Sequence, residues 1–67
     1  MSVTILEALQ NADYNLQNNG HLGAMIAKQQ VHNATILLEK GYSIDDDLDA
    51  LLEPYENVDE VPNKITY

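Results

Sequence analysis

Apolar side chains in the first part of the chain recur at the spacing of an amphipathic helix. They step by four, three and four residues, which places them on one stripe of a 3.6-residue helix. Thr4 followed by Glu7 has the spacing of a capping box, in which both side chains satisfy free amides at a helix start. The Asn-Asn-Gly at 18–20 is typical of a helix end. We expect a first helix here, with a buried stripe at Ile5, Leu9, Ala12 and Leu16.

A second helix is predicted from His21 to Lys40, because this stretch lacks proline and holds a single glycine, Gly23. Its apolar residues cover more than one face, which indicates contacts on two sides, with neighbouring helices or with a second copy of the chain. Gly41 and the preceding lysine have the pattern of a Schellman-type helix end. The central stripe steps by four, three and four again, at Ala27, Val31, Ala34 and Leu38.

A short third helix is predicted from an N-cap at Ser43 to about Glu53, ended by Pro54. In that register the aspartates at 45–47 occupy the first turn, where negative charge meets exposed amides. Residues 54–67 show no helical period and are predicted to form an extended acidic tail. The expected architecture is all-α: a three-helix unit over 1–53, a tail over 54–67, and a homodimer formed through the second helix.

Composition limits the class of protein. A chain of 67 residues has room for one domain, and without cysteine it has neither disulfides nor thiolate metal sites, so we expect a cytoplasmic protein. Three lysines, no arginine and eleven acids give a formal net charge of -8. Such a charge disfavours direct contact with nucleic acid or an anionic membrane, and favours a basic protein surface as partner.

The acidic residues are concentrated late in the chain, since nine of the eleven lie between residues 39 and 60. This segment is the predicted partner-binding surface. Carboxylates spaced about four residues apart could imitate a phosphate backbone and compete for a surface that handles nucleic acid. By analogy with small acidic phage inhibitors, the leading hypothesis is a stoichiometric binding protein or inhibitor. Its candidate residues are Asp45, Asp46, Asp49, Glu53, Glu56, Asp59 and Glu60.

Catalysis, metals and cofactors are not expected. From Asp45, the acidic spacing resembles a twelve-residue calcium loop, but Ala50 replaces the turn glycine and Pro54 stands where the next helix should begin. His21 and His32 are eleven residues apart, about 16 Å along a helix, which is too far for one metal ion. No nucleophile signature or phosphate loop is present.

Two other functions remain open. Tyr14, Lys28 and His32 could stack on and neutralise a small nucleotide-like ligand, in which case the protein would be an oligomeric sponge. The bland interpretation of these side chains is an ordinary solvated helix face. Alternatively, the tail from Pro54 to Tyr67 could fold onto a toxin, as in an antitoxin-like partner.

Overall fold

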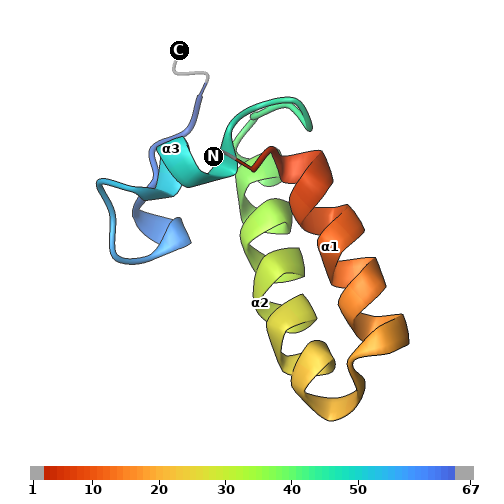
Figure 1. Cartoon of the computed structure of the whole chain (residues 1–67). Helices are drawn as coiled ribbons and strands as arrows, with labels where there is room; N and C mark the ends of the chain where they lie inside the picture. The colour runs from red at the N-terminus through yellow and green to blue at the C-terminus, as the bar shows by residue number, and fades with distance from the viewer. Residues whose placement is uncertain (1–2, 65–67) are drawn as a thin grey trace.

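The computed structural model describes residues 3–64 and is all-α over this range. Helices α1 (Ile5–Asn18) and α2 (Gly20–Glu39) form an antiparallel hairpin. The short helix α3 (Leu48–Leu52) and the 3-10 helix η1 (Val58–Glu60) belong to a C-terminal segment that lies beside α2, at the end away from the hairpin turn (Figure 1). The predicted three-helix fold is therefore confirmed.

Local sequence signals set both ends of the hairpin helices. The capping box of α1 is formed, since Glu7 N donates to Thr4 Oγ1 at 3.1 Å and Thr4 N donates to Glu7 Oε1 at 3.4 Å. Gly20, at φ 58°, makes the turn between the helices. At the end of α2, Gly41 has φ 98° and Tyr42 N donates to Leu37 O at 3.1 Å, as in a Schellman motif. The predicted helix boundaries at these three points are confirmed.

The two hairpin helices contact each other through small side chains, and the predicted apolar stripes need correction. On α1, Ala8 is buried in addition to Ile5 and Ala12, while Leu16 is exposed. On α2, Leu37 is fully buried, whereas Val31 and Leu38 are 41% and 37% exposed. Because alanine and glycine bring the backbones close together, the leucines beside them are pushed to the flank. The buried positions of α2 are Gly23, Ala27, Ala34 and Leu37.

The third helix begins later than the sequence predicts. Asp47, and not Ser43, is its N-cap, with Asp47 Oδ1 accepting from Ala50 N at 3.1 Å. Residues 43–47 instead run beside the start of α1, where Ile5 N donates to Asp46 O and Leu6 N donates to Ile44 O. These bonds satisfy amides that a helix start leaves free, and they hold 43–47 out of a helical conformation. The aspartates at 45 and 46 therefore precede α3.

The segment predicted as an extended tail, 54–67, is described as far as Lys64, and this part is packed on the helices. Val58 and Val61 are buried in the same core cluster as Ile5 and Leu37. Tyr42 Oη donates to Pro62 O at 2.8 Å, and Lys64 N donates to Lys40 O at 2.9 Å. The turn over 57–60 is held by a second capping box, Asn57 with Glu60, which the sequence interpretation did not use.

Candidate functional site

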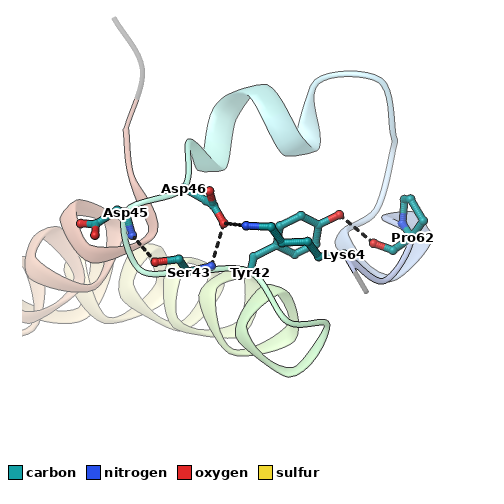
Figure 2. Close-up of polar contacts among 6 residues, drawn as sticks. All are labelled: Tyr42, Ser43, Asp45, Asp46, Pro62 and Lys64. Carbon is teal, nitrogen blue, oxygen red and sulfur yellow. Dashed lines mark hydrogen bonds and ion pairs between the residues drawn. The ribbon is translucent and has the colours of Figure 1, made fainter. Parts of the chain in front are cut away.

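The acidic residues divide into those that hold the fold and those that do not. Asp46 belongs to the first group, because its Oδ2 accepts from Ser43 N at 2.7 Å and from Lys64 Nζ at 3.2 Å (Figure 2). The backbone hydrogen bond from Ser43, aided by Lys64, lowers the pKa of the Asp46 carboxyl from its ordinary value. Asp46 therefore ties the loop after α2 to the C-terminal segment.

Asp49 and Glu60, also predicted to bind a partner, have structural contacts as well. Asp49 Oδ2 accepts from Val3 N at 3.1 Å, which joins α3 to the residues that precede α1. Glu60 Oε2 accepts from Glu56 N and from Asn57 N, both at 3.0 Å. Both carboxylates accept from backbone amides, so any contact with a partner would compete with these hydrogen bonds.

The other predicted carboxylates are available for a partner. The side chains of Asp45, Glu53, Glu56 and Asp59 are exposed and form no hydrogen bond or ion pair with other residues in the range 3–64. Figure 2 shows the Asp45 carboxylate directed away from Lys64. The regular helical row predicted from Asp45 to Glu53 is not formed, because Asp45 lies before α3. The free carboxylates instead surround α3 and the turn that follows it.

Two of the residues with free carboxylates, Glu56 and Asp59, line a cavity between α2 and the C-terminal segment. The cavity has a volume of about 280 Å³. It brings Glu56 and Asp59 to the same hollow as His32, a residue that the sequence interpretation assigned to a different site. Tyr55 and Leu52 also line it. The remaining lining residues are Gln29, Asn33, Asn57 and Val58.

This cavity was not predicted, because it depends on the packing of the C-terminal segment against α2. Its α2 side is formed by Gln29, His32 and Asn33, which share one face of the helix at spacings of three and four. The only sequence signal for the opposite wall is the capping-box spacing of Asn57 and Glu60, which fixes the turn carrying Asp59. A long-range contact between these elements cannot be inferred from local spacing.

The alternative ligand trio is only partly assembled within one chain. Lys28 and His32 lie one turn apart on α2 and are both exposed, whereas Tyr14 is on α1, 62% exposed, and is not among the cavity residues. Lys28 differs from the other two lysines. Lys40 Nζ donates to Asp59 O and Lys64 Nζ pairs with Asp46, but Lys28 has no hydrogen bond or ion pair within the described part of the chain.

Among residues 3–64 there is no group of three or more histidine or acidic side chains arranged to hold a metal ion. Within the same range, none of the helices is both long and apolar enough to cross a membrane. Comparisons with protein-family models, with curated proteins and with solved structures give no significant match to this chain. The site must therefore be interpreted from its own chemistry.

Proposed function

We propose that the protein is a stoichiometric binding protein whose acidic C-terminal segment docks on a basic surface of another protein. The observation that carries this proposal is the pair of free carboxylates, Glu56 and Asp59, in the cavity beside α2. Neither carboxylate forms an ion pair within the range 3–64, since Lys40 Nζ donates to the backbone carbonyl of Asp59 and not to its side chain. Both carboxylates can therefore accept from an external cation. The net charge of -8 adds a field that attracts basic partners over a longer range.

The chemistry of the cavity favours a lysine or arginine side chain as the group that enters it. A guanidinium can form paired hydrogen bonds with a carboxylate and can stack on an aromatic ring such as Tyr55. At about 280 Å³ the cavity is near the lower limit of ligand pockets, roughly 300–1,000 Å³, so it suits a side chain better than a nucleotide. Asp45 and Glu53 would add contacts outside the cavity. Protein surfaces that bind nucleic acid are rich in arginine and lysine, and such a surface would offer a side chain to each of these carboxylates.

Calorimetric titration with a synthetic arginine-rich peptide tests this function. We expect saturable binding that weakens as salt is raised. The double variant Glu56→Gln with Asp59→Asn should lose at least ~10-fold in affinity, because each lost charged contact is worth about 1 kcal/mol or more. Glu39 lies outside the cavity and outside the contacts proposed around it, so Glu39→Gln is the matched control for the single variant Glu56→Gln. Equal losses in these two single variants would show that only net charge matters.

A second candidate function is supported by Lys28, the lysine that has no internal partner in the range 3–64. Its neighbours one turn away on α2 include no acid, so it is available for an anionic group such as a phosphate. In an oligomer, Tyr14 of one copy could stack on a base held by Lys28 and His32 of another. This function predicts that a nucleotide copurifies with the protein, that Lys28→Gln and Tyr14→Ala abolish the copurification, and that His21→Gln does not.

A further inference from the structure

We propose that two copies of this chain associate through one apolar side of the α1–α2 hairpin. We call this side the hairpin face. It consists of Leu6, Leu9 and Leu16 of α1 with Ala24, Val31 and Leu38 of α2. This proposal is independent of the cation-binding function, because the face lies away from the cavity.

The positions in the hairpin face follow from the way the helices pack. The contact between α1 and α2 repeats at three- and four-residue steps, through Ala8 and Ala12 on one helix and Ala27 and Ala34 on the other. On each helix, one flank of this contact is formed by positions that repeat every seven residues, because such positions fall on nearly the same line of a helix. Because the helices are antiparallel, these two flanks are on the same side of the pair. The flanking residues are Leu9, Leu16, Ala24, Val31 and Leu38.

The C-terminal segment does not cover this side. It packs on the face of α2 that carries Gln29, His32 and Asn33, which is about 100–160° around the helix from Val31 at 100° per residue. Leu16 is 56% exposed, and Val31 and Leu38 are 41% and 37% exposed. The opposite side of α1 carries Glu7, Asn11 and Asn18. On the opposite side of α2 the exposed Leu22 and Ile26 stand beside polar residues, so the hairpin face is the side on which both helices present apolar side chains. An apolar surface bordered by polar side chains is typical of an interface.

The charge distribution identifies a second copy as the occupant. Two chains of net charge -8 repel each other wherever their acidic segments meet, but the hairpin face itself carries no charge. Its outer edges carry Asp13 on α1 and Lys28 on α2, which have opposite signs. A second copy, related to the first by a two-fold axis parallel to the hairpin, places its α2 against the α1 of the first copy. In this arrangement each Asp13 faces a Lys28 of the other copy. The same surface is therefore complementary to itself.

The area of the hairpin face approaches that of a standard interface. Helix α2 has 20 residues and is about 30 Å long, helix α1 has 14 residues and is about 21 Å long, and each helix is about 10 Å wide. The projected area is then about 500 Å², and the accessible area of a surface with side chains is larger. Standard interfaces bury about 800 Å² on each partner. Most of one side of the hairpin would be covered.

Sedimentation equilibrium on the full chain tests this proposal. The expected mass is twice the 7.5 kDa of one chain, with dissociation on dilution. Leu16→Lys with Val31→Lys should raise the dissociation constant by at least ~100-fold without loss of helix, because both side chains are exposed in the monomer. The milder Val31→Thr should weaken the dimer in the same direction. The matched control, Leu22→Lys with Ile26→Lys, changes equally exposed apolar residues on other sides of α2 and should leave the dimer intact.

A charge exchange tests the orientation of the two copies. Asp13→Lys and Lys28→Asp should each weaken the dimer, and the combined variant should recover most of the lost affinity. A monomeric wild-type chain would overturn the proposal. So would a dimer that the Leu22 and Ile26 control dissociates while the Leu16 and Val31 variant does not.

Discussion

Gly23 lies at a point of close approach between α1 and α2, and its replacement by alanine tests this packing. A Cβ atom at this position would overlap the backbone carbonyl oxygen of Asn15 and would stand 2.7 Å from the Cβ of Asn19. A backbone carbonyl cannot rotate away as a flexible side chain can. The helices would therefore have to separate, which would loosen the contacts of Ala12 and Ala27 beside Gly23.

Two opposing effects set the size of this change. Alanine is favoured over glycine in a helix by about 1 kcal/mol, so helix propensity alone predicts that Gly23→Ala stabilises the protein. Overpacking of a close contact costs about 1–3 kcal/mol. Because the overlap is with backbone, we expect the upper part of this range and a net loss of about 1–2 kcal/mol. For a domain of this size that loss lowers Tm by roughly 5–15 °C.

Thermal denaturation followed by far-UV circular dichroism, at one protein concentration, measures this effect. Thr35→Ala on the exposed side of α2 is the control, since it changes helix propensity without a close contact and should leave Tm unchanged or slightly higher. A higher Tm for Gly23→Ala would refute the close approach of the two helices.

Three further predictions concern the stability of the fold. Leu37→Ala should cost about 2–5 kcal/mol in urea unfolding because Leu37 is fully buried, whereas Leu38→Ala should cost less than about 1 kcal/mol. Val61→Ala should lower the unfolding free energy by about 1–3 kcal/mol, and no change would show that the C-terminal segment is not part of the core. The folded-state pKa of Asp46 is lowered, so its stabilising effect should be present at neutral pH and lost as pH falls from about 3.8 through that lowered pKa. Asp46→Asn should remove this part of the pH dependence of Tm, with little change in the remainder.

The sequence predicts those features that depend on neighbouring residues. The capping box of Thr4 and Glu7 and the helix end at Gly41 are formed because each involves hydrogen bonds within a few residues. The three-helix fold follows from these boundaries and from the apolar spacing. The buried residues of α2 cannot be predicted from the same signals, because Leu37 and Leu38 are both apolar. Only the close packing of the alanines places Leu37 in the core and leaves Leu38 at the surface.

Long-range contacts account for the features that were wrong or missed. Ser43 and Asp47 are both good N-caps by residue type, and the hydrogen bonds from α1 to residues 44 and 46 decide between them. The same limit applies to the candidate site. Seven carboxylates look equivalent in the sequence, but Asp49 and Glu60 bind backbone amides while Glu56 and Asp59 face a cavity. Charge is visible in a sequence, whereas the partner of each charge depends on the fold.

The central claim is that free carboxylates in the cavity beside α2 bind a cationic side chain of a partner. Nuclear magnetic resonance titration of the full chain with a capped arginine, with capped glutamine as the uncharged control, tests this most directly. We expect saturable shifts for arginine alone, centred on His32, Asn57 and Asp59. Equal shifts with glutamine, no saturable shift, or shifts centred on Tyr14 and Lys28 would contradict it.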